Sequence, residues 1–89
     1  AKNDQIRYKG GVENEFLTDK QIGEIIKKHR IYRDLTQAEL GEKLGVRAAA
    51  VQKWESGLVK NIKRSILREL SITLDIHPAT LIGIKMKKD

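Results

Sequence analysis

The stretch "RAAAVQKWESG", residues 47–57, combines hydrogen-bonding side chains with a run of alanines. An arginine such as Arg47 can donate two parallel hydrogen bonds to guanine, a glutamine such as Gln52 can pair with adenine, and Lys53 can bind guanine or a phosphate. Alanine has no such groups, so Ala48 and Ala49 could offer only apolar contact, for example to a thymine methyl. These residues are our candidates for contacts to DNA bases. In the alternative, Arg47 and Lys53 contact only phosphates, and the alanines indicate that this segment recognises DNA bases weakly or no longer.

Residue types that support catalysis or metal binding are sparse. The chain has no cysteine, and its two histidines, His29 and His77, are far apart in the sequence. This excludes thiolate chemistry and disulfides and does not provide a zinc site. His29 falls on an apolar stripe and is interpreted as a core histidine, whereas His77 precedes Pro78 and is expected to support a turn. No pairing of a nucleophile with a base is evident, so we predict a protein that is not an enzyme and holds no metal or cofactor.

Composition and charge indicate a polyanionic partner. The chain has 89 residues and a formal net charge of +6, which attracts nucleic acid first and an anionic membrane surface second. Its 39% hydrophobic and 34% charged residues suit a small, well-solvated helical domain. No apolar run is long enough to span a bilayer, and the lack of cysteine favours a reducing, intracellular setting. We therefore expect a cytoplasmic protein without a membrane partner.

Capping signals and apolar spacing predict five helices and no convincing strand. Thr18 with Gln21, and Thr36 with Glu39, have the spacing of a capping box, in which two side chains satisfy each other's backbone amides. Apolar residues recur at helical spacing after each of these caps and in the later segments. The predicted helices cover 19–33, 37–44, 48–55, 62–74 and a short segment opened by Pro78. The pattern is typical of a compact all-α domain.

Single residues predict where these helices end and how they pack. Asp34 and Gly45 tolerate left-handed backbone and should end the first two helices. Gly41 should allow the third helix to approach the second closely, and Asn61 is a candidate cap for the fourth. Side chains expected to face the core in the second half of the chain include Val51, Trp54, Leu81 and Ile82.

Residues 22–83 resemble the Cro and C1-type helix-turn-helix domains of phage repressors and related bacterial regulators. The matching segments are "IGEIIKKHR", "LTQAELGEKLGV", "VQKWESG" and "LRELSITLDIHPATLIG". The resemblance implies a five-helix, lambda-repressor-like domain whose third helix enters the major groove while the second crosses the DNA backbone. It implies a transcriptional regulator of bacterial or phage origin, a repressor that binds a pseudo-palindromic site on double-stranded DNA as a homodimer.

The resemblance also implies contacts to DNA phosphates from Gln37, from Ser56 and from the loop before the fourth helix. Gln37 lies at a helix N-terminus, where backbone amides favour an anion. The same resemblance matches Arg30 and Glu55 to a pair that is either a structural ion pair or a device that aims the arginine at the backbone, and we favour the structural pair. A basic flank follows the third helix and consists of Lys60, Lys63, Arg64 and Arg68. Of these, Lys60, Lys63 and Arg64 are predicted to contact DNA phosphates as well.

Three departures from the family pattern concern the third helix and the core. Arg47 stands where a serine or threonine cap is usual, so the third helix should lack a side-chain cap. Ala48 and Ala49 replace residues that often read bases, and His29 replaces an aliphatic residue.

The chain divides into an N-terminal arm, a domain and a tail. Residues 1–17 are predicted to be flexible or loosely docked, with a weak hairpin around Gly10-Gly11. The domain covers 18–83, and 84–89 forms a charged tail or the start of a linker. Two other functions stay open: an antitoxin or other protein-interaction module that binds a toxin, and the DNA-binding segment of a longer repressor with a C-terminal domain.

Overall fold

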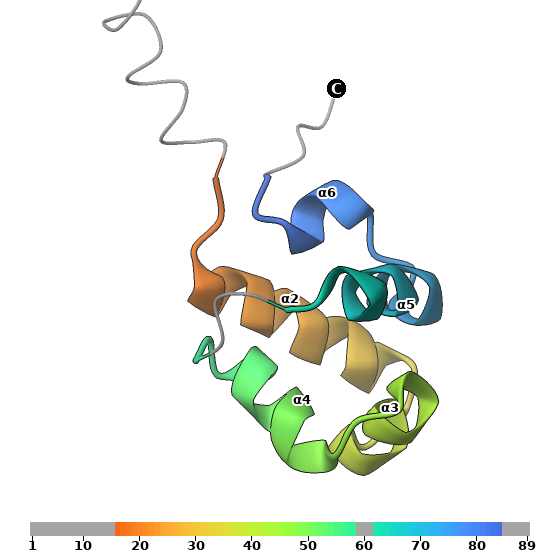
Figure 1. Ribbon diagram of the computed structural model, residues 1–89. Coiled ribbons are helices and arrows are strands. Elements are labelled where there is room, and N and C mark those ends of the chain that lie inside the picture. Colours follow the sequence, from red (N-terminus) through yellow and green to blue (C-terminus); the bar gives the residue numbers. More distant parts are fainter. Residues whose placement is uncertain (1–15, 59–61, 85–89) are drawn as a thin grey trace, which may run out of the picture.

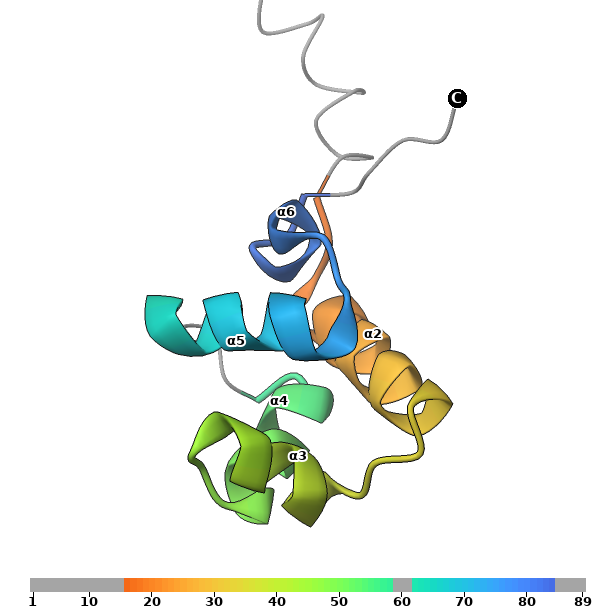
Figure 2. The ribbon, with the colours of Figure 1, turned by 90° about the vertical axis from the view of Figure 1, so that its right-hand side faces the viewer.

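The computed structural model describes residues 16–58 and 62–84, and within these ranges it contains five helices and no strand beyond one isolated β-bridge. Two views at right angles place α3 and α4 at one end of the molecule, α2 and α5 across the middle and α6 at the other end (Figures 1 and 2). The predicted all-α architecture is confirmed. The helices are α2 (Asp19–Tyr32), α3 (Gln37–Leu44), α4 (Ala48–Glu55), α5 (Arg64–Leu74) and α6 (Pro78–Leu81).

Both predicted capping boxes are formed. The Thr18 hydroxyl accepts from the Gln21 amide at 3.0 Å, and the Thr18 amide donates to the Gln21 side chain at 2.9 Å. The corresponding bonds between Thr36 and Glu39 are 3.0 and 2.8 Å long. Because each box satisfies two backbone amides that have no partner within the helix, the sequence predicts the starts of α2 and α3 correctly.

The predicted helix ends are also confirmed at two positions, but the predicted start of α5 is wrong. Asp34 and Gly45 adopt positive φ angles of 58° and 75°. Helix α5 begins at Arg64 rather than at 62, and its N-cap is Lys63 rather than Asn61, which lies outside the described residues. Ile62 is partly buried against the core before the helix starts, so this apolar residue fits the helical spacing without being helical.

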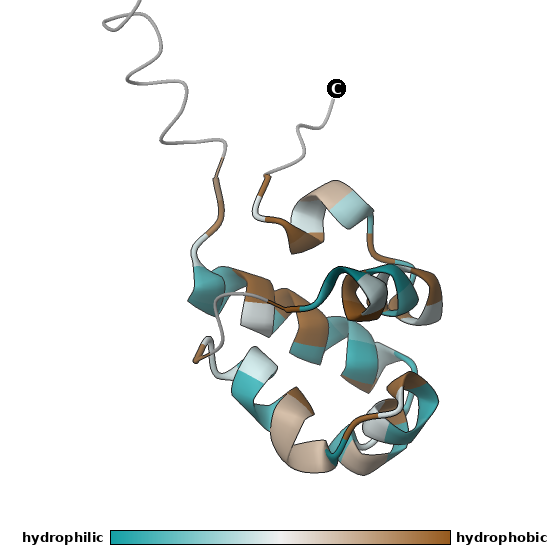
Figure 3. Cartoon of the chain, in the orientation of Figure 1, coloured by the Kyte–Doolittle hydropathy of each residue, from teal (hydrophilic) through white to brown (hydrophobic). Residues whose placement is uncertain are grey.

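The core lies between α2, α3, α4 and α5, and Figure 3 shows hydrophobic segments in each of these helices. Ile26, Leu40 and Val51 are completely buried, and Trp54 is 6% exposed, which confirms the inward orientation predicted for α4. Leu81 packs against this core as predicted, but Ile82 is 64% exposed and that prediction is wrong. Helix α6 ends at Leu81, and Ile82 is the C-cap residue where the chain leaves the helix.

Two glycines allow α4 to lie close to its neighbours. A Cβ atom at Gly41 would stand 2.6 Å from the carbonyl oxygen of Val46 and 3.3 Å from that of Arg47, so the close approach predicted at Gly41 is made by the turn and the N-cap residue of α4. A Cβ atom at Gly23 in α2 would collide with the carbonyl oxygens of Trp54 and Glu55 at the end of α4. Both contacts involve backbone atoms, which cannot rotate away, so any side chain at these positions forces the helices apart.

The two ends of the described chain meet at the end of the molecule opposite α3 and α4 (Figures 1 and 2). Phe16 and Ile84 form an isolated antiparallel bridge, and the Leu17 amide donates to the Gly83 carbonyl at 2.6 Å. The arm and hairpin predicted over residues 1–15 and the tail over 85–89 lie outside the described residues. In the part of the chain that the structure covers, no helix has both the length and the apolar character to cross a membrane.

Candidate nucleic-acid interface

Helices α3 and α4 are joined by a tight turn that fixes their relative orientation. Gly45 ends α3 in a left-handed conformation, and the Val46 amide donates to the Gly41 carbonyl at 2.8 Å. The left-handed residue directs the chain sharply across the end of α3, and α4 begins three residues after Gly45, at Ala48. The pair therefore has the geometry of a helix-turn-helix unit, with α4 at the surface of the domain.

One face of α4 is open to solvent along its whole length. Its exposed positions recur at the spacing of one helix face, and in Figure 3 the alanine turn is pale brown and the following turn is teal. Ala49 is exposed at the start of this face, whereas Ala48 is half-buried. The exposed residues of the face are Ala49, Gln52, Lys53 and Ser56.

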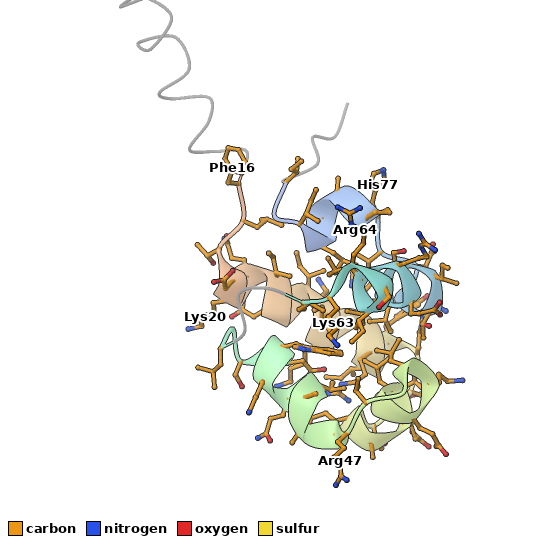
Figure 4. The ribbon with its side chains drawn as sticks, viewed as in Figure 1. Phe16, Lys20, Arg47, Lys63, Arg64 and His77 are labelled. Carbon is orange, nitrogen blue, oxygen red and sulfur yellow. The ribbon has the colours of Figure 1, made fainter. Side chains whose placement is uncertain are left out.

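Arg47 lies at the N-terminal end of α4 and makes no capping hydrogen bond with its side chain, as predicted. Its backbone is extended, with φ −87° and ψ 160°, and its side chain points away from the body of the domain (Figure 4). The first turn of α4 contains no acidic residue. The positive end of the helix and an exposed guanidinium therefore combine at one point, which favours an anionic or electron-rich partner.

Arg30 and Glu55 form a buried, bidentate ion pair, as predicted for a structural pair. The Arg30 Nε donates to Glu55 Oε2 at 2.6 Å, and Nη2 donates to Oε1 at 3.1 Å. A third donor, Nη1, binds the Leu35 carbonyl at 2.6 Å. The Arg30 side chain is only 10% exposed, so this arginine points into the protein and joins α2 to the end of α4 and to the loop before α3.

Two residues predicted to contact phosphates already make hydrogen bonds within the protein. Gln37 Nε2 donates to Glu55 Oε1 at 3.0 Å, and the Ser56 hydroxyl donates to the Gln52 carbonyl at 2.9 Å. The sequence contains no local signal for the Gln37–Glu55 bond, because the two residues are 18 positions apart and belong to different helices. Both side chains lie at ends of helices in the α3–α4 unit, which keeps them beside the exposed face.

The predicted basic flank divides between two sides of α5. Lys63 extends from the start of α5 toward α4, whereas Arg64 points toward α6 (Figure 4). Arg64 and Arg68 line a groove of about 270 Å³ between α5 and α6, together with Leu67, Pro78 and Ile82. Lys60 lies outside the described residues.

The histidines are explained by local hydrogen bonds. Nδ1 of the half-buried His29 lies 2.8 Å from the Ile25 carbonyl oxygen, to which it donates. Nδ1 of His77 accepts from the Ala79 amide at 3.0 Å and caps α6, as predicted for the turn before Pro78. Within the described residues, no group of three or more histidine, cysteine, aspartate or glutamate side chains is arranged to hold a metal ion.

A helix-turn-helix unit with an exposed second helix and a basic N-terminal end defines the class as a DNA-binding domain of transcription regulators. The comparison with protein families agrees, since the helix-turn-helix family model matches residues 26–81. The chain belongs to this helix-turn-helix family, in its XRE and phage-repressor branch.

Two curated relatives are uncharacterised HTH-type transcriptional regulators of Sinorhizobium fredii. The chain is 34% identical to y4aM and 33% identical to y4wC over 61 residues, which are 68% of this chain in both cases. The matched part is 42% of the length of each relative. The chain therefore spans less than half the length of these regulators.

Solved structures show the same fold. The P22 c2 repressor, solved in complex with a synthetic operator, is 31% identical with a TM-score of 0.63, covering 68% of this chain and 91% of the repressor chain. A chain of the SinR–SinI complex is 33% identical with a TM-score of 0.61, covering 68% and 59%. PlcR of Bacillus thuringiensis, solved with the peptide PapR7 and DNA, is 30% identical with a TM-score of 0.65, covering 79% and 24%.

Proposed function

We propose that this protein is a sequence-specific repressor that binds a pseudo-palindromic operator in double-stranded DNA as a homodimer, with α4 in the major groove. The observation that carries the proposal is the open face of α4, which begins at the exposed Arg47 and continues through Gln52 and Lys53. A helix presented in this way by a helix-turn-helix unit fits the major groove, and its N-terminal residues come nearest to the base edges. A protein of this kind acts on DNA in the bacterial cytoplasm.

The side chains of this face divide into polar readers and apolar contacts. Arg47, Gln52 and Lys53 provide the hydrogen bonds to base edges, with Arg47 matched to guanine and Gln52 to adenine. Ala49 is exposed and can contact a thymine methyl, whereas Ala48 is half-buried and contributes a smaller contact. The small alanine side chains let the helix approach the base pairs closely.

Contacts to the DNA backbone fix the orientation of the domain. Gln37 at the start of α3, Ser56 after α4 and Lys63 before α5 are suited to phosphates. The Ser56 hydroxyl must exchange its bond to the Gln52 carbonyl for a phosphate. Arg64 points toward α6 and reaches the backbone only if its side chain rotates. Lys60 completes the predicted set from the loop outside the described residues.

The experiment that tests the proposal is selection of bound duplexes from a randomised pool, followed by affinity measurements against salt concentration. We expect enrichment of one two-fold-related motif and a preference that persists as salt increases. Arg47→Ala, Gln52→Ala and Lys53→Ala should each lose about 1–3 kcal/mol of discrimination at one base position. Lys28→Ala, an exposed lysine on α2, is the matched control for lost charge. Equal binding of selected and unselected duplexes at every salt concentration would refute a sequence reader.

Dimer formation is tested separately by sedimentation of the protein alone and with the selected duplex. We expect two chains per operator, because a two-fold site matches a two-fold protein. One chain per duplex would be compatible with α4 in the major groove but would contradict the homodimer.

A protein-interaction module, such as an antitoxin that masks a toxin, is the second candidate. It is favoured by the partners in the related structures, since SinR was solved with SinI and PlcR with a peptide. The matched part is only 42% of the length of each curated relative, as expected if this chain is the DNA-binding segment of a longer repressor. Stable copurification with a protein encoded beside it, together with no selected DNA motif, would favour this candidate.

A further inference from the structure

Glu55 joins two side chains of different character at the junction of α2, α3 and α4. Its Oε1 atom accepts from both Arg30 Nη2 at 3.1 Å and Gln37 Nε2 at 3.0 Å, and its side chain is only 4% exposed. We infer that Glu55 is a positioning residue of the DNA site, which holds the Gln37 amide so that its second N–H is presented to a backbone phosphate. The inference rests on the proposed DNA-binding function.

The hydrogen-bonding capacity of Gln37 permits this role. A primary amide has two N–H groups, and the bond to Glu55 uses one of them. Gln37 is half-buried and is the first residue of α3, where backbone amides without partners in the helix also favour a phosphate. One N–H is thus fixed inside the protein, and the other is left at the helix end that attracts anions.

Arg30 makes a carboxylate acceptable at this position. An isolated acid beside a phosphate would repel it, but the bidentate pair with Arg30 offsets the charge of Glu55. Arg30 itself donates to Glu55 and to the Leu35 carbonyl and is 10% exposed in its side chain. The buried pair therefore orients the Gln37 side chain toward the DNA, whereas the Arg30 side chain stays inside the protein.

Holding Gln37 in advance favours binding. A glutamine side chain has several rotatable bonds, and ordering them at the moment of association weakens affinity. The carboxylate of Glu55 fixes the amide before DNA arrives. The entropy of ordering the Gln37 side chain is therefore lost when the protein folds and not when it binds DNA.

The test is a mutant cycle with Gln37→Met, the paired replacement Arg30→Met/Glu55→Leu and the variant that combines them. The paired replacement removes the acceptor oxygens of Glu55 without leaving the Arg30 charge buried and unpaired. Affinity is measured for a duplex of arbitrary sequence at low salt, because phosphate contacts carry no sequence information. We expect Gln37→Met to weaken binding by about tenfold, the worth of one oriented hydrogen bond, and the paired replacement to weaken it by a similar factor. The combined variant should bind no more weakly than the weaker of these two, because Glu55 acts through Gln37. Losses that multiply, or either of the two binding like the wild type, would overturn the inference.

A second measurement does not depend on the folding of any Glu55 variant. In the wild-type protein, the two side-chain amide protons of Gln37 are followed by NMR with and without the same duplex. We expect one proton to be hydrogen-bonded in the free protein and the other to shift when DNA binds, whereas the exposed Gln21 amide, the internal control, stays unchanged. A second proton that does not shift on binding would mean that Gln37 presents no N–H to the DNA, which would overturn the inference.

The outcomes also separate this inference from the proposed function. Binding without sequence preference, but with the coupled loss and the NMR shift, supports the positioning role and contradicts the sequence reader. Sequence-selective binding without coupling contradicts only the positioning role. The absence of binding to any duplex overturns both.

Discussion

The replacement Gly23→Ala tests the closest contact between the scaffold helix α2 and the reading helix α4. An added Cβ atom would lie 2.6 Å from the Glu55 carbonyl oxygen and would also collide with the carbonyl oxygen of Trp54. Ordinary contacts to both oxygens require that the helices separate by roughly 1 Å at this point. The colliding atoms belong to backbone at the end of α4, so the separation must displace the helix itself.

The expected loss of stability is the difference between two opposing effects. Overpacking of a tight contact costs about 3 kcal/mol at the upper end of the usual range. Alanine in place of glycine within a helix returns about 1 kcal/mol through its higher helix propensity. We therefore expect the free energy of unfolding to fall by about 2 kcal/mol, which corresponds to a decrease in Tm of roughly 10 °C for a domain of this size.

Urea denaturation of Gly23→Ala, followed by the fluorescence of Trp54, the single tryptophan of the chain, measures the effect directly. Glu24→Ala is the matched control, because Glu24 is the next residue of α2 and is exposed. The control should change stability by no more than about 0.5 kcal/mol. A Gly23→Ala protein as stable as the wild type, or more stable, would refute the argument that α2 and α4 are in backbone contact at this position.

Three further replacements have effects of different sign and size. Arg47→Ser should supply the missing N-cap of α4, raise stability by about 1 kcal/mol and weaken specific DNA binding, so an unchanged melting temperature in a thermal scan would contradict the cap argument. Glu55→Ala should cost about 3–5 kcal/mol in a denaturation experiment, because it leaves the Arg30 charge buried without its partner; Arg30→Met/Glu55→Leu should recover most of that loss. Gly45→Ala meets no neighbouring atom but retains a positive φ angle, so we expect a loss of about 1 kcal/mol by the same assay, and a larger loss would show that the turn itself has rearranged.

The sequence predicts those parts of the fold that depend on neighbouring residues. The capping boxes at Thr18 and Thr36 are local hydrogen-bond patterns, so the spacing of their residues is enough to place the starts of α2 and α3. Asp34 and Gly45 end their helices through backbone conformations that depend on residue type. The errors occur where apolar spacing continues beyond a helix, as at Ile62 and Ile82.

The candidate site is less predictable because its residues are joined across helices. The spacing of Gln52 and Lys53 within α4 predicts that they share one face. Nothing in the sequence indicates that Gln37 is held by Glu55, or that Arg64 points toward α6, since both depend on how separate helices pack. The base and phosphate contacts themselves stay predictions.

The bridge between Phe16 and Ile84 has a consequence for protein engineering. The chain enters and leaves the folded unit at neighbouring points, joined by the short hydrogen bond from Leu17 to Gly83. A unit with adjacent ends can be spliced into a surface loop of a carrier protein, or have its ends joined and new ones opened elsewhere, without stretching the chain. Because α4 lies at the opposite end of the unit (Figure 1), a carrier grafted there would keep its bulk away from the exposed face of that helix.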